Sequence, residues 1–136
     1  MELTHDTVLL IIKLACAVFT AILMLQSGLD KVFNYADNKE WLTGFFEKTP
    51  LNGTVSVLLP VITALEVAAG GFSAVGAVML LINKDNQTAA FLGALFAAKS
   101  FICLFFGQRI AKDYTGSANM TVNFIFSILA LLVYSM

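Results

Sequence analysis

Four long apolar stretches make up most of this 136-residue sequence, and short polar segments separate them. The stretches cover about residues 8–29, 55–82, 88–107 and 118–134. Each stretch is close in length to the roughly 20 residues that an α-helix needs to cross the hydrocarbon core of a bilayer. The alternating pattern of a membrane barrel strand is absent from the sequence, and a helix satisfies its backbone groups within the segment. The sequence therefore predicts an all-α integral membrane protein.

Composition and loop length extend this prediction to the architecture. Apolar residues are 59% of the sequence and charged residues 12%, whereas a soluble domain has roughly 25% charged residues. Only residues 83–87 separate the second and third stretches, so these helices must be antiparallel neighbours. We expect residues 1–136 to form one domain, an up-and-down four-helix transmembrane bundle. The net charge of −1 argues against nucleic acid as a partner.

The segment between the first two stretches has a helical pattern of its own. Asp37 and Glu40 have the spacing of a capping box, with Asp in place of Ser or Thr. The apolar residues that follow share one helical face: Trp41, Leu42, Phe45 and Phe46. We expect a short helix that lies in the membrane interface. Two interpretations stay open: the helix covers the end of the bundle, or its aromatic residues line the mouth of a lipid-side or quinone-type site.

Two charged residues lie near the middle of apolar stretches, Glu66 in the second and Lys99 in the third. A charge in hydrocarbon is costly and persists where it finds a partner inside the bundle. At a rise of about 1.5 Å per residue, both lie roughly 16 Å from opposite membrane faces. The sequence predicts that they form an intramembrane ion pair. The pair would either fix the helix register or provide a group that exchanges protons or binds a polar ligand.

Polar and small residues recur at helical spacing along the first and fourth stretches. Lys13, Ser27, Gly28 and Lys31 lie on one stripe of the first, and Asn123 lies on a polar stripe of the fourth. Small and polar faces of membrane helices pack against other helices. We expect these residues to form a polar inner face.

Further polar residues are expected near one membrane face. These are Gln26, Asp30, Trp41 and Arg109. They would form the hydrogen-bonding end of an apolar slot for a quinone, or would contact lipid headgroups and cap helices. The segment 107–116 is also rich in interface-forming residue types: Arg109, Lys112, Asp113 and Tyr114. We expect this loop to dock on a partner protein, with anionic headgroups as the alternative.

The sequence does not predict a complete active site within this chain. The sequence has one histidine, which excludes a haem held by two histidines of this chain. Cys16 and Cys103 are not in a Cys-x-x-Cys arrangement, and their expected depths differ by roughly 10 Å, too far for a disulfide. No catalytic triad, phosphate loop or metal-ligand cluster is recognisable. We expect no self-contained active site and no intrinsic cofactor.

Two segments of the sequence resemble a known family. Ser27-Gly28-Leu29-Asp30-Lys31 closes the first stretch, and Leu65-Glu66 precedes Gly70-Gly71 in the second. This pattern resembles the DoxX family of small four-helix membrane proteins, although members often have Arg where this chain has Lys13. The resemblance implies a small subunit of a quinone-linked respiratory complex in the bacterial plasma membrane, beside other membrane proteins. A solute or proton carrier that uses the region of Glu66 and Lys99, or a structural scaffold, is the alternative.

Basic residues in the short loops predict the orientation. The first and third loops contain Lys31, Lys39, Lys48, Arg109 and Lys112, whereas the other side has Lys84 and Lys13. The positive-inside rule places the first and third loops in the cytoplasm and both termini outside.

Overall fold

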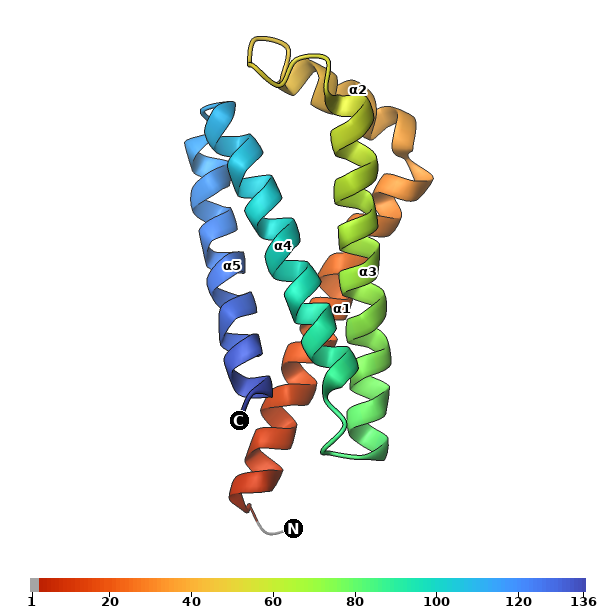
Figure 1. Cartoon of the computed structure of the whole chain (residues 1–136), viewed down its shortest axis with the longest axis vertical. Helices are drawn as coiled ribbons and strands as arrows, with labels where there is room; N and C mark the ends of the chain where they lie inside the picture. Colours follow the sequence, from red (N-terminus) through yellow and green to blue (C-terminus); the bar gives the residue numbers. More distant parts are fainter. Residues whose placement is uncertain (1–2) are drawn as a thin grey trace.

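The computed structural model describes residues 3–136, which form five helices and no strand. Their bounds are α1 (His5–Phe33), α2 (Tyr35–Phe45), α3 (Val55–Ile82), α4 (Thr88–Ile110) and α5 (Tyr114–Tyr134). By length and composition, α1, α3, α4 and α5 could each cross a membrane. Figure 1 shows these four helices side by side, with the short α2 across one end.

The helices extend beyond the apolar stretches at several ends. α3 begins and ends where expected, but α1 continues through Asp30 and Lys31 to Phe33. At its start, Thr4 caps α1 and accepts a hydrogen bond from the backbone N–H of Thr7 at 3.2 Å. An apolar run ends where charges begin, but a lysine does not end a helix, because its long side chain loses little conformational freedom there.

The α1–α2 corner is held by a side chain that belongs to α1. Asp30 accepts hydrogen bonds from the side-chain amides of Asn34 at 2.8 Å and Asn38 at 3.3 Å. The expected capping box of Asp37 and Glu40 is wrong, because α2 begins earlier, after Asn34, and has no side-chain cap. The short helix itself is present, as predicted.

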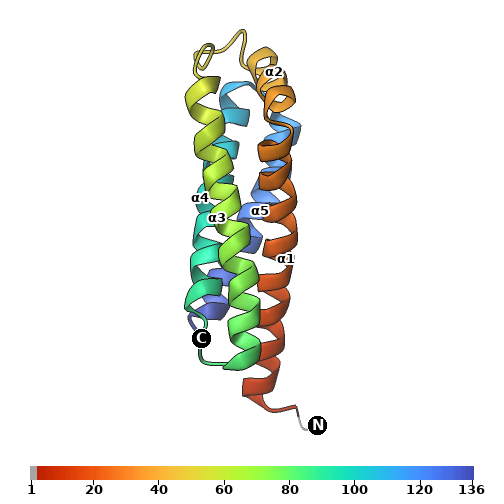
Figure 2. The same cartoon turned by 90° about the vertical axis from the view of Figure 1, so that its right-hand side faces the viewer.

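Glycines set how closely α3 approaches α4. A Cβ on Gly76 would collide with the backbone of Ala90, and one on Gly93 would collide with Ser73. These two contacts run in opposite directions along the two helices, so α3 and α4 are antiparallel. Their register places Glu66 of α3 opposite Ser100 of α4. The other extensive contacts are between α1 and α3 and between α4 and α5. Figures 1 and 2 both show these helices as neighbours.

The interior is built mainly from small side chains. One cluster of buried residues draws on all four long helices and contains Ala17, Leu80, Ala90, Ala94, Ala130 and Tyr134. Beneath α2, the ring of Phe46 is buried against α3 and lies 3.2 Å from where a Cβ on Gly107 of α4 would be. This contact fixes the end of α2 over α3 and α4. The α2 segment and the α4–α5 turn share one end of the molecule, opposite the start of α1 and the end of α5 (Figure 1).

Candidate functional site

A buried ion pair joins α1 to α3. Nζ of Lys31 lies 3.0 Å from Oε1 of Glu66 and donates to Oε2 at 3.3 Å. The same ammonium donates to Oγ of Ser27 at 3.0 Å. The Glu66 side chain is 1% exposed and that of Lys31 is 16% exposed. A charge this deeply buried depends on its partner, since little water reaches it.

Two glycines bring the backbones of α1 and α3 together beside this pair. A Cβ on Gly28 would lie 2.9 Å from Cγ2 and 3.0 Å from the backbone N of Val67. A Cβ on Gly70 would lie 2.7 Å from the backbone N of Leu25. These distances are shorter than van der Waals contact, so only glycine fits at either position without a shift. The sequence therefore encodes both the ion pair and the close contact that encloses it.

The expected pairing of Glu66 with Lys99 is wrong. Glu66 pairs with Lys31, while Lys99 is exposed and its Nζ lies 5.2 Å from the ring centroid of Phe96. The helix register does bring Lys99 near the height of Glu66. Its direction differs, because the neighbouring Ser100 and Ala98 take the buried positions of α4. Depth was predictable from counting residues, but the direction of the side chain was not.

The polar inner face is present in part. Lys13 and Gly28 are buried, whereas Ser27, Lys31 and Asn123 are half-buried. Oη of Tyr134 donates to the backbone carbonyl of Lys13 at 3.5 Å, which joins α5 to α1. The stripe that contains Ser27, Gly28 and Lys31 was the signal for the ion pair. The sequence does not reveal that this stripe contacts Glu66, because Lys31 lies beyond the apolar run of the first stretch.

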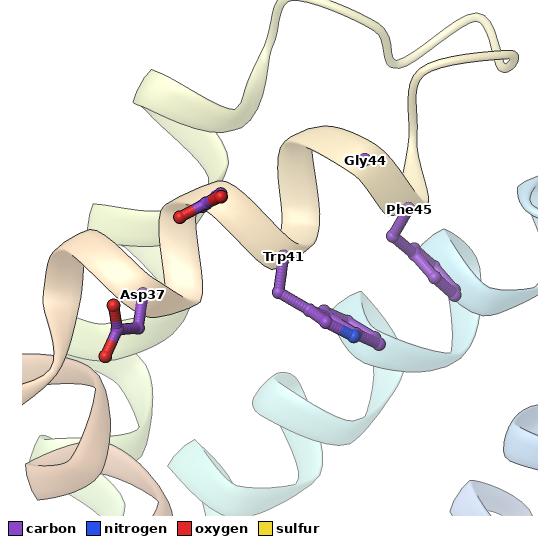
Figure 3. Close-up of a pocket in the computed structure, with 5 residues that line it drawn as sticks. Asp37, Trp41, Gly44 and Phe45 are labelled. Carbon is purple, nitrogen blue, oxygen red and sulfur yellow. The ribbon is translucent and has the colours of Figure 1, made fainter.

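An open hollow of about 520 Å³ lies against α2. Its lining comes from one helix and consists of Asp37, Glu40, Trp41, Gly44 and Phe45. The rings of Trp41 and Phe45 stack with centroids 4.9 Å apart and 17° between their planes. Figure 3 shows both rings pointing to the same side of α2, with Trp41 one turn and Phe45 two turns beyond Asp37. Trp41 is 65% exposed, so the hollow has an aromatic wall and an open side.

The residues expected to share a quinone end do not gather in one pocket. Asp30 is engaged at the α1–α2 corner, and Gln26 is exposed on α1. Trp41 belongs to the hollow on α2. Arg109 lies at the end of α4, where its guanidinium carbon is 4.6 Å from the ring centroid of Tyr114. In the hollow, the neighbours of Trp41 are Asp37, Glu40 and Phe45 and not the residues expected from the sequence.

The α4–α5 connection is a tight turn rather than a ten-residue loop. Helix α4 ends at Ile110 and α5 begins at Tyr114. Lys112 has a positive φ of 61°, and Oδ1 of Asp113 accepts from the backbone N–H of Gly116 at 3.0 Å as the helix cap. Asp113 and Lys112 thus serve the turn itself. Arg109 and Tyr114 are exposed and keep the surface position that docking requires.

Within residues 3–136, no group of three or more His, Cys, Asp or Glu side chains could hold a metal ion. Cys16 and Cys103 are free thiols, as expected from their difference in depth. Comparison of the chain with protein-family models, with curated proteins and with solved structures finds no match.

Proposed function

We propose that this chain is a small multi-pass subunit of a quinone-linked redox complex in the bacterial plasma membrane. Insertion of α1, α3, α4 and α5 as an up-and-down bundle is supported by large apolar side chains on their outer faces. Examples are Ile22, Val57, Leu81 and Val122, each 67% to 71% exposed. Such surfaces are costly in water and favourable in lipid.

The observation that carries the redox assignment is the aromatic hollow on α2. A quinone ring would stack on the face of the Trp41 indole that Phe45 leaves open. The carboxylates of Asp37 and Glu40 would accept from the hydroxyls of the reduced ring. The hollow has its lining on one side, so the second wall would come from lipid or from a neighbouring subunit. A quinone supplies two-electron redox chemistry when bound.

The DoxX-like segments support the same assignment. Ser27 and Lys31 come from the first segment and Glu66 from the second, and the three side chains meet at the ion pair. This contact gives the two segments one structural role, to hold α1 against α3. It also favours a subunit over a carrier, because Lys31 neutralises Glu66 and the contact at Gly28 leaves no space there for a solute.

The proposed orientation places α2 and the α4–α5 turn in the cytoplasm. Lys39, Lys48, Arg109 and Lys112 lie at that end, and Lys84 lies at the other. A C-terminal fusion to a reporter that is active only in the periplasm should be active. An inactive C-terminal fusion, together with an active fusion in the α2–α3 loop, would reverse the orientation.

Trp41 provides the test of the quinone site, because it is the single tryptophan of the chain. The protein is placed in lipid nanodiscs and titrated with a short-chain ubiquinone while tryptophan fluorescence is recorded. A bound ring should quench Trp41 in a saturable manner. Phe45→Leu should weaken the apparent affinity by about tenfold, because it removes the ring that stacks on Trp41 and holds the indole in place.

A matched control separates binding from simple partitioning of the quinone into lipid. In the variant Trp41→Phe with Val122→Trp, the fluorophore lies on the outer face of α5. Its quenching should rise linearly with quinone concentration. If wild-type quenching is equally linear and indifferent to Phe45→Leu, the hollow on α2 is not a quinone site.

A further inference from the structure

Lys99 is the middle residue of the 23-residue helix α4, and it is exposed on the outer surface. In the described part of the chain, the salt bridges are Lys31 with Glu66 and Lys84 with Asp6. The contact of the Lys99 ammonium is the ring of Phe96, at 5.2 Å from its centroid. Within residues 3–136, the contact of this cation is therefore an aromatic face, and no carboxylate pairs with it.

The position of Lys99 in the helix makes this cation hard to hydrate if α4 spans a bilayer, as the proposed function requires. Eleven residues precede it in α4 and eleven follow it, which puts either helix end roughly 16 Å away. A lysine side chain reaches the interface when it lies near a helix end, but from mid-depth it falls short. A lone cation at this depth calls for a polar partner.

The surface around Lys99 combines the cation with apolar and aromatic side chains. It comprises the exposed side chains Lys99, Cys103 and Phe72 together with the half-buried Phe96, and we call it the Lys99 face. Phe72 of α3 and Phe96 of α4 stack with centroids 5.6 Å apart and planes 6° apart. This stack makes a continuous apolar surface across two helices, with the Lys99 ammonium over the Phe96 ring.

A second copy of this chain cannot neutralise Lys99. Glu66 is the one acidic residue of the sequence near the middle of a long helix, and it is 1% exposed and paired with Lys31. A two-fold dimer through the Lys99 face would also bring two Lys99 side chains toward each other, since each copy presents the same patch.

We propose that the Lys99 face binds a transmembrane helix of a different protein, which carries an Asp or Glu at mid-depth. The carboxylate pairs with Lys99, and the apolar flanks of the helix pack on Phe72 and Phe96. The proposal rests on the subunit role and names the chemistry of the neighbouring subunit. An intramembrane charge pair specifies both the partner and its register, because a helix without the carboxylate leaves the lysine unpaired.

The test uses a defined probe, an oligo-leucine transmembrane peptide of about 23 residues with one central Asp. Cys103 lies one turn from Lys99 on the same face and is exposed. In a Cys16→Ser background, Cys103 is the single thiol and carries a benzophenone photo-crosslinker. The protein and peptide are reconstituted together in phosphatidylcholine vesicles and irradiated. The Asp peptide should give about tenfold more adduct than the same peptide with Leu at its centre.

The variants connect any preference to the lysine. Lys99→Leu and Lys99→Gln should both abolish the preference for the Asp peptide, and Lys99→Arg should keep it. Circular dichroism identifies a variant that is not helical, in which case the other neutral variant decides. As a position control, Val122→Cys on α5, in a background without Cys16 and Cys103, should show no preference.

Three outcomes would overturn the proposal: equal adduct with both peptides, a preference that survives in the neutral variants, or a crosslinked homodimer as the main product. The subunit role is measured separately, from the size of the native wild-type complex. A large complex without Asp preference overturns the Lys99 proposal alone. A solitary chain that still prefers the Asp peptide overturns the subunit role alone.

Discussion

The ammonium of Lys31 lies 3.0 Å from Oε1 of Glu66, beside Gly28, where the backbones of α1 and α3 come close. Both charges are shielded from water, so each depends on the other. Lys31→Met should destabilise the protein by about 3 kcal/mol or more, because it leaves the Glu66 carboxylate buried and unpaired. The double variant Lys31→Met with Glu66→Gln should lose much less than the sum of the two single variants. Unfolding in mixed detergent micelles measures this difference.

Lys99 supplies the matched control for this double-mutant cycle. Lys99 does not contact Glu66 in the structure, so losses in Lys99→Met and Glu66→Gln should add within about 0.5 kcal/mol. If instead Glu66 couples to Lys99 and not to Lys31, the assigned partner of Glu66 is wrong.

Gly70 and Gly71 are adjacent in α3 but meet different surroundings. A Cβ on Gly70 would collide with Leu25 of α1, whereas nothing lies within 4 Å of a Cβ on Gly71. Gly70→Ala should lower the melting temperature, since α1 must move away from α3. Gly71→Ala should leave it unchanged or raise it, because alanine is favoured over glycine in a helix by up to about 1 kcal/mol. Equal shifts in the two variants would argue against close contact between α1 and α3.

Lys112 adopts a left-handed backbone conformation in the α4–α5 turn, with φ of 61°. An L-residue with a Cβ pays roughly 1 kcal/mol or more for this conformation, and glycine does not. Lys112→Gly should therefore raise the melting temperature by a few degrees. Lys112→Ala serves as the control for loss of the charge and should have no stabilising effect. A stabilisation of equal size by alanine would assign the effect to charge rather than to the backbone.

The α4–α5 turn allows docking and folding to be separated. Asp113→Ala removes the cap on the N–H of Gly116 and should cost about 1 kcal/mol of stability without altering partner binding. Replacing both Arg109 and Tyr114 with Ala removes an exposed cation–π pair, so it should release the partner and leave the fold intact. For both variants, native gels measure partner binding and thermal melts measure stability. If the double variant still migrates with its partner, the α4–α5 turn is not the docking site.

The positions of the long helices were predictable from the sequence, because the length of an apolar run depends on neighbouring residues alone. The bounds of α3 follow directly from its apolar run, and the short α2 follows from the pattern around Trp41 and Phe45. The start of α2 was missed, because Asp30 holds Asn34 and Asn38 through a contact formed only after the chain turns.

The partner of Glu66 could not be predicted from the sequence. Counting residues gave Glu66 and Lys99 similar depths, but a depth leaves the rotation of each helix undetermined. That rotation is set by where glycines permit close contact: Gly28 and Gly70 turn Glu66 toward α1, and Gly93 packs against Ser73. Lys31 lies past the apolar run of α1 yet still reaches Glu66, since the helix continues to Phe33.

Native purification tests the subunit role most directly. The tagged chain is extracted from its own membranes in a mild detergent, and the eluate is analysed by native gel, subunit mass spectrometry and visible absorption. If the subunit role is correct, the eluate contains a complex larger than the 14.7 kDa chain, with stoichiometric membrane partners and the absorption of haem, flavin or iron–sulfur groups. A chain that elutes alone or only as a homo-oligomer, without such absorption, would contradict it.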